Sequence, residues 1–188
     1  MEQKSNHSKM HSLKLLLWLA CGSITMTFAA FTSAYIVQKS SALWQVVEIP
    51  NGFIINMLTV LALSFSIHKA YLSLKNKSGE GFNMYLKLAF ILMVSFISLQ
   101  FYAYYELISN NIALLNMQSQ AGPFLYVISG VHALHILLGL VFMIALALLY
   151  KKQGAIEQNT LRAELCATYL HFMGGLWIFL CLFFVINH

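Results

Sequence analysis

Five long apolar stretches dominate this sequence and leave few folds open to it. Each can cross a hydrocarbon core of about 30 Å as a helix, which takes roughly 20 residues at about 1.5 Å per residue. With 60% hydrophobic and 9% charged residues, the chain needs lipid around it, because a soluble core of this size could not hide so much apolar surface. We therefore predict an all-α integral membrane protein with five transmembrane helices, over residues 13–37, 52–74, 85–108, 124–150 and 165–186.

The segments between these helices are short and polar, so none is long enough for a second domain. We expect a single membrane domain over residues 1–188. The first helix could instead be a cleaved signal peptide, since Lys4, Lys9 and Lys14 precede it. Its apolar run is longer than the hydrophobic region of such peptides usually is, which favours a membrane helix.

Basic residues set the expected orientation, because lysine and arginine resist translocation across the membrane. Lys39 lies on one side of the predicted helices, and the other ten basic residues lie on the opposite side: Lys4, Lys9, Lys14, Lys69, Lys75, Lys77, Lys87, Lys151, Lys152 and Arg162. We expect the N-terminus in the cytoplasm and the C-terminus, His188, on the periplasmic side. Nucleic acid is not an expected partner, since the basic residues are scattered and the aromatic residues lie inside apolar runs.

Histidines give the first candidates for a cofactor site. His132 and His135 stand three residues apart on the fourth predicted helix, so they share a face, and His171 lies in the fifth. Together they could form a three-nitrogen metal site or supply an axial haem ligand. The alternative is that each makes a buried hydrogen bond to a facing helix or contacts a lipid headgroup. Their neighbours in sequence supply no carboxylate or cysteine to complete a metal shell, which favours the alternative.

The predicted helices have almost no ionisable residues at membrane depth. Transporters and proton pumps usually keep such groups near the midplane in spite of their energetic cost. Here five of the six acidic residues lie in the tail, the loops or the helix ends, and Glu106 is near the outer end of the third helix. We therefore do not expect ion translocation by this chain alone. Asn56 and Gln100 are uncharged, and we expect them to link helices by hydrogen bonds.

Two motifs on the last two helices resemble those of a known family. Ser129-Gly130-Val131-His132-Ala-Leu-His135, followed by Gly139, is similar to the signature T-G-x-H-x-x-H-x-x-x-G. Further on, Glu164 precedes Tyr169-Leu-His171-Phe172 and Trp177-x-Phe179, which are similar to Y-W-H-F-V-D-x-x-W-x-F. The chain thus resembles subunit III of cytochrome c oxidases and related quinol oxidases, in the short five-helix form that lacks two N-terminal helices.

The chain departs from the family pattern at four positions. Ile24 stands where many members have a membrane-embedded glutamate, so any role of that carboxylate in lipid anchoring or proton supply should be absent. Ala103 and Gly174 replace two further acids, and Leu170 replaces a tryptophan. These losses indicate a divergent member whose role is mainly scaffolding.

The resemblance implies a subunit with no redox centre of its own. Haem and copper are then expected in partner subunits I and II, with phospholipid bound to this chain. In the family, phospholipids lie in a V-shaped cleft beside the first two helices, so here that cleft would be partial or completed by another subunit. By the same carry-over, six residues are expected to be structural or lipid-contacting, and none catalytic, metal-binding or cofactor-binding: His132, His135, Glu164, Tyr169, His171 and Trp177.

The implied function is to stabilise subunit I and support proton uptake during the reduction of oxygen to water, in the cytoplasmic (inner) membrane of a bacterium. The electron donor, the partner's haem types, the identity of the lipids and membership of a supercomplex stay open. Two other classes also stay open. One is a b-type haem membrane anchor that uses His132 or His135 with His171. The other is a small transporter, which the lack of midplane charge and of internal repeats disfavours.

Overall fold

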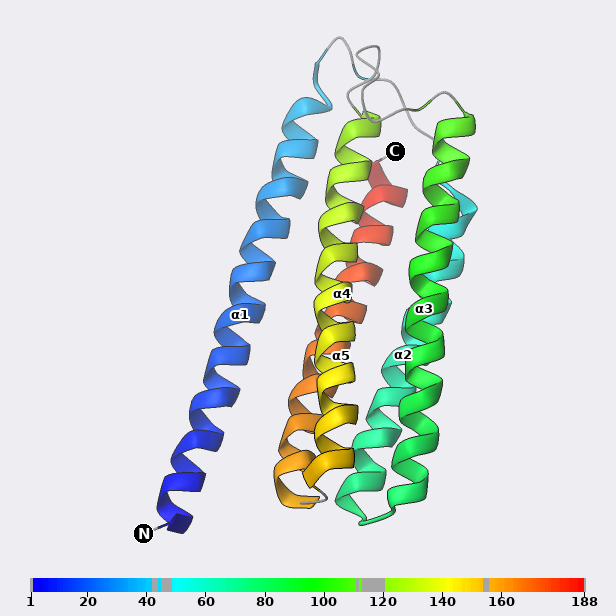
Figure 1. Ribbon diagram of the computed structural model, residues 1–188. Coiled ribbons are helices and arrows are strands. Elements are labelled where there is room, and N and C mark those ends of the chain that lie inside the picture. Colours follow the sequence, from blue (N-terminus) through cyan, green and yellow to red (C-terminus); the bar gives the residue numbers. More distant parts are fainter. Residues whose placement is uncertain are drawn as a thin grey trace.

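The computed structural model consists of five long helices joined by short connections (Figure 1). It describes residues 2–41, 44, 49–110, 112, 121–153 and 156–187. The helices are α1 (Glu2–Gln38), α2 (Asn51–Lys75), α3 (Gly79–Ser109), α4 (Ala121–Gln153) and α5 (Ile156–Asn187). Each contains a stretch long and apolar enough to cross a membrane. The prediction of an all-α membrane protein with five transmembrane helices is confirmed.

Every helix extends beyond the range predicted from its apolar run. α3 begins at Gly79 rather than near Tyr85, and α5 begins at Ile156 rather than near Leu165. The added turns contain polar residues such as Glu80. Apolar runs mark only the part of a helix that lies in hydrocarbon, so they miss the turns that reach into the headgroup region or water.

Consecutive helices run in opposite directions, and the two ends of the bundle differ in charge (Figure 1). The start of α1, the α2–α3 turn and the α4–α5 connection lie at one end, which we call the basic end. The ten basic residues that the sequence places on one side of the membrane belong to this end. Lys39 lies at the opposite end, together with the C-terminal end of α5. The C-terminal His188 lies outside the described residues. The cytoplasmic location of the basic end stays a prediction.

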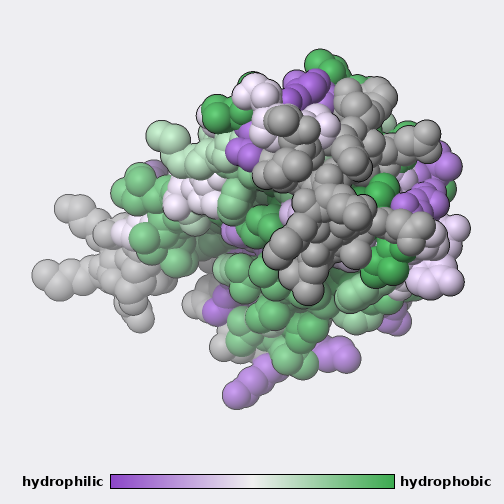
Figure 2. Space-filling model, turned by 90° about the horizontal axis from the view of Figure 1, so that it is seen from above, coloured by the Kyte–Doolittle hydropathy of each residue, from purple (hydrophilic) through white to green (hydrophobic). Residues whose placement is uncertain are grey.

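The helices do not pack equally closely. α2 packs along α3 and α5, and α5 also packs on α4. α1 lies at one edge of the bundle, where it contacts α4 and α5 (Figure 1). The large exposed side chains on the outer faces are mostly apolar, among them Met26, Leu58 and Phe101. Figure 2, a view from above, shows hydrophobic residues over much of the surface that is coloured. Such a surface suits lipid and would be costly in water.

The core contains aromatic residues that meet edge to face. Trp177, Phe53 and Phe96 are each at most 1% exposed. The centroid of the Trp177 ring lies 5.4 Å from that of Phe53 and 5.5 Å from that of Phe96, at interplanar angles near 80°. This geometry places positive ring edges against negative ring faces. α5 is therefore fixed to α2 and α3 by aromatic contacts at one point in the core.

A polar pair links α2 to α3 inside the same core. Nδ2 of Asn56 donates a hydrogen bond to Oε1 of Gln100 at 3.2 Å, and both side chains are buried. A buried amide pair of this kind holds two membrane helices in register. The prediction that these two residues link helices by a hydrogen bond is confirmed.

Candidate functional site

His132 lies at the centre of the bundle and is fully buried. Its ring packs at 4.9 Å from the Trp177 ring with an interplanar angle of 30°, and both Phe28 and Phe96 lie 6.1 Å away. Neither ring nitrogen has a hydrogen-bond partner in the described part of the chain. Side chains from α1, α3 and α5 thus close around the imidazole of His132, which packs as an aromatic ring in the core.

His135 faces a different environment, although it lies one turn along the same helix. Its Nδ1 donates to the carbonyl oxygen of Val131 at 2.7 Å, within α4. The hydroxyl of Tyr169 donates to the carbonyl oxygen of His135 at 2.8 Å and so joins α5 to α4. His135 and Tyr169 form a structural link between the last two helices.

These two residues also line a groove beside α1, which we call the α1 groove. Its volume is about 490 Å³. The rest of its wall is almost entirely apolar and comes from Leu13, Leu16, Leu17, Ala20, Ser23, Ile24, Leu138, Phe142 and Leu165. The groove is apolar, and it is open because α1 stands at the margin of the bundle.

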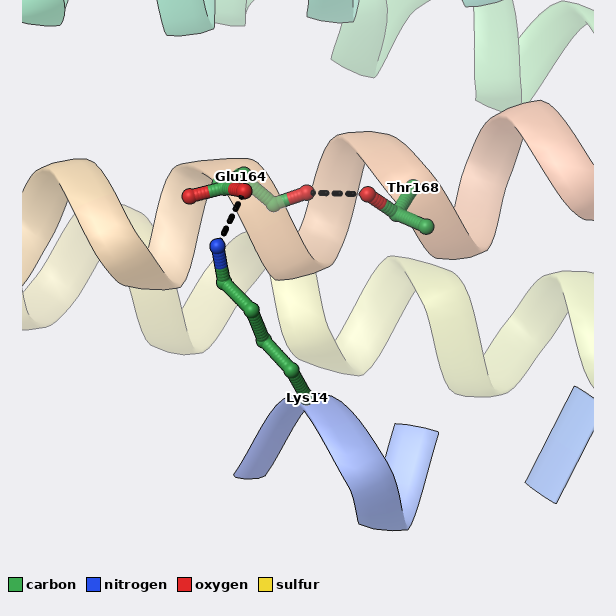
Figure 3. A network of polar contacts seen from close by, with 3 residues as sticks. All are labelled: Lys14, Glu164 and Thr168. Atoms are coloured by element: carbon green, nitrogen blue, oxygen red, sulfur yellow. Dashed lines mark hydrogen bonds and ion pairs between the residues drawn. The ribbon is translucent and has the colours of Figure 1, made fainter. Parts of the chain in front are cut away.

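Glu164 joins α5 to α1 near the basic end (Figure 3). Its Oε1 lies 2.5 Å from Nζ of Lys14, which makes an ion pair as well as a hydrogen bond. The hydroxyl of Thr168 donates to the backbone carbonyl of Glu164 at 2.8 Å. The side chain of Glu164 is 36% exposed and that of Lys14 is 40% exposed. The ion pair is therefore partly hydrated, and it positions α1 more than it stabilises the fold.

His171 lies on the side of α5 that meets α2. Its Nδ1 shares a hydrogen bond with the hydroxyl of Ser64. The ring of His68, also on α2, has its centroid 5.5 Å from that of His171. Ser64 and His171 are half-buried and His68 is exposed. Together with Gly175, one turn further along α5, these residues make up what we call the histidine face.

The three histidines singled out by the sequence therefore occupy three environments: the core, the α1 groove and the histidine face. Within the residues that the structure describes, no group of three or more His, Cys, Asp or Glu side chains could hold a metal ion. The i, i+3 spacing placed His132 and His135 on one helix face, but packing buried one ring and turned the other toward α1.

Residues 12–187 match the family model described as cytochrome c oxidase subunit III. The chain belongs to this family. The subunit III family lacks a metal centre of its own, and membership implies association with other oxidase subunits.

Relatives of the chain include subunits of cytochrome c oxidases and of quinol oxidases. It is 23% identical to cytochrome c oxidase subunit 3 of Bacillus sp. (strain PS3) over 168 residues, which cover 87% of this chain and 80% of the relative. It is 28% identical to the cytochrome bo(3) ubiquinol oxidase subunit 3 of Buchnera aphidicola subsp. Schizaphis graminum over 177 residues, or 91% and 92% of the two chains. For quinol oxidase subunit 3 of Bacillus subtilis, identity is 22% over 184 residues, 96% of this chain and 88% of the relative.

The positions where the resemblance implies family acids differ in their packing. Ala103 is fully buried, and a Cβ added to Gly52 would lie only 2.9 Å from the Ala103 Cβ. A Cβ on Gly174 would lie 2.9 Å from Cγ1 of Val60. Ala103 thus lies in a close contact between α2 and α3, and Gly174 lies in a close contact between α2 and α5. Ile24, in contrast, is only partly buried and lines the α1 groove.

Sequence reasoning missed two partners of the motif residues. His68 belongs to neither motif, although a histidine inside an apolar helix is unusual enough to be a signal. From the sequence, Lys14 is a positive charge before the first predicted helix, with nothing to mark it as the partner of Glu164. Neither pairing follows from the sequence alone, because 103 or more positions separate the partners and only the packing of the helices joins them.

Proposed function

We propose that this chain is the non-catalytic subunit III of a haem-copper terminal oxidase. It stabilises subunit I and supports proton uptake during the reduction of oxygen to water. The family match over residues 12–187 is the observation on which this rests. The positions of His132, Tyr169 and Trp177 in helix-to-helix contacts also support it, because they suit a structural role.

The proposal places the chain in the aerobic respiratory chain of a bacterium. The membrane is the cytoplasmic (inner) one, with the basic end in the cytoplasm and a single membrane domain over residues 1–188. Subunits I and II are its partners and contain the haem and copper. The relatives include both cytochrome c and quinol oxidases, so they do not favour one electron donor, and the proposal is independent of supercomplex membership.

Within this proposal, the histidine face docks subunit I. Imidazole and hydroxyl groups exposed to hydrocarbon are costly, and they are usually covered by protein that offers hydrogen bonds. Gly175 has open space where a Cβ would lie and lines a groove between α1 and α5, so a partner helix that enters this groove can approach the α5 backbone closely. The contacts of Ser64 with His171 thus prepare a polar surface for a partner helix that has a hydrogen-bonding side chain at the same depth.

The α1 groove is proposed to hold phospholipid acyl chains. His135 and Tyr169 are then lipid-contacting residues from the motif set, and the Lys14–Glu164 pair closes the groove toward the headgroup region. Because Ile24 replaces the family glutamate, support for proton uptake comes through the packing of subunit I and its lipid rather than through a carboxylate of this helix.

Deletion of the chain tests the proposed function. Membranes from a deletion strain should contain less assembled, haem-loaded subunit I and consume oxygen more slowly per subunit I at high pH, where proton supply limits the rate. Both defects should return to normal on complementation. Unchanged amounts of subunit I together with an unchanged rate at every pH would contradict the proposal.

A pair of glycine substitutions tests the docking face. Gly175 and Gly22 are both helical glycines with open space at the Cβ position, on α5 and α1 respectively. Gly175→Leu should reduce the recovery of subunit I with the tagged chain several-fold, whereas Gly22→Leu should leave it near normal. Equal recovery with both variants would show that subunit I docks elsewhere.

A further inference from the structure

A second groove lies on the opposite side of α4 from the α1 groove, between α3 and α4 near the basic end. Its volume is about 400 Å³, and no residue of α1 or α5 lines it. Lys87 and Asn83 contribute from α3 and Lys151 from α4, and the other lining residues are apolar, among them Phe90, Ile91 and Ile144. None of the motif residues is part of it.

The polar lining residues gather at one end of this groove. The Tyr150 and Phe82 rings pack with centroids 4.5 Å apart, which places Lys151 level with Asn83, since each directly follows one of these rings. Lys87 lies about 6 Å further into the bundle, one helical turn from Asn83, and Ile91 lies one turn beyond it. The groove thus changes from cationic to apolar along the membrane normal.

The charges at this end have no ion-pair partner among the described residues. Lys87 and Lys151 are both exposed. Neither forms an ion pair within the described residues, in which Lys14 and Glu164 form the one salt bridge. Glu80 lies on the same face of α3 as Lys87, about 10 Å nearer the start of the helix than Lys87. It does not line the groove. Two unpaired ammonium groups above an apolar groove complement a molecule with an anionic head and a hydrocarbon tail.

We propose that this groove is a binding site for an anionic phospholipid. The phosphate lies between Lys87 and Lys151, near the amide of Asn83. An acyl chain follows the groove past Phe90 and Ile91 toward Ile144. A partner helix is a poorer fit, because a helix with its side chains is about 10 Å wide and would have to match two lysines at different depths. The site is separate from the α1 groove and does not depend on the proposed function.

Native mass spectrometry of the full-length chain in detergent tests the site. The probes are phosphatidylglycerol and phosphatidylcholine with identical acyl chains. Phosphatidylglycerol should bind more tightly, and Lys87→Gln/Lys151→Gln should weaken it by about fivefold for each lysine, the contribution typical of a basic residue near an anionic headgroup. Lys75→Gln/Lys152→Gln is the matched control, because it removes two exposed lysines at the same end that do not line the groove. This control should keep its affinity.

Two results would overturn the proposal. One is equal binding of the two lipids. The other is an equal loss of affinity in the groove and control variants, which would indicate a general effect of surface charge.

Photo-crosslinking in native membranes identifies the occupant directly. The photoreactive residue p-benzoylphenylalanine replaces Ile91, whose side chain is 60% exposed and lines the apolar part of the groove. Irradiation should yield the chain with the added mass of a phospholipid. A crosslink to another polypeptide, or the absence of a phospholipid adduct, would contradict the proposal.

Discussion

At the scale of single residues, His132 shows how a histidine from a family motif can be structural. Its ring fills a space between Trp177, Phe28 and Phe96, and its nitrogens make no hydrogen bond within the described residues. A buried polar group without a partner costs free energy, whereas the contacts of the ring itself stabilise the core. The contacts seen for this residue are therefore those of its ring.

Substitutions at this contact should separate shape from polarity. Trp177→Ala should lower the free energy of unfolding by about 3–5 kcal/mol, because it leaves a large cavity in the core. His132→Leu should change it by much less, because it removes two unpartnered nitrogens and keeps most of the volume. Unfolding of the purified chain in mixed detergent micelles measures both values. A loss in His132→Leu as large as that in Trp177→Ala would contradict this account.

The Lys14–Glu164 pair should contribute little to stability. Both side chains are more than a third exposed, and ion pairs of this kind contribute about 0–1 kcal/mol. A double-mutant cycle with Lys14→Gln and Glu164→Gln should therefore give a coupling energy below about 1 kcal/mol that falls further in high salt. A coupling of several kcal/mol, insensitive to salt, would mean that the pair is buried by a partner in the assembled oxidase.

At the scale of helices, two positions where the resemblance implies a family acid lie in close contacts between helices. Gly174 packs against Val60, and Ala103 packs against Gly52. α2 therefore lies close to both α5 and α3 at these points. A carboxylate at either position would need space that this packing has removed. Ile24 differs, because it faces the α1 groove.

Restoring the family acids should therefore have unequal effects. Gly174→Asp should prevent normal assembly of the helices, because its side chain would collide with Val60 and introduce a buried charge without a partner. Ile24→Glu should yield folded protein in nearly normal amounts, because its side chain reaches the open groove. Expression and size-exclusion chromatography compare the two variants. Similar behaviour of both would show that contacts with Val60 do not limit this position.

The helices were predictable from sequence, and their contacts, apart from the link through Asn56 and Gln100, were not. Apolar runs located all five spans because hydrocarbon thickness fixes their length. The side of each helix that faces protein was not visible, because in lipid both the packed and the exposed faces are apolar and the 3.6-residue pattern of soluble helices is lost. That is why His135 and His171 could be placed on helices but not assigned to the α1 groove and the histidine face.

At the scale of the whole molecule, the chain divides into an edge helix and a four-helix body. α2, α3, α4 and α5 share the aromatic core, while α1 adds Phe28 and Tyr35 to it and leaves the α1 groove beside its residues 13–24. The surfaces that we assign to subunit I and to two lipid sites lie on different sides of this body. A subunit of this kind can hold a catalytic partner and its surrounding lipid in fixed positions without any reaction centre.

The association with a catalytic subunit is the central claim, and affinity purification tests it most directly. The tagged chain is purified from native membranes in mild detergent, and its visible spectrum, oxygen consumption and co-purifying proteins are measured. We predict haem bands, oxygen reduction and a large multi-span partner, all of which separate from the chain when a harsher detergent dissociates the complex and leaves the chain colourless. A chain that is purified alone and colourless, or one that retains a haem band after separation from every partner, would contradict the account.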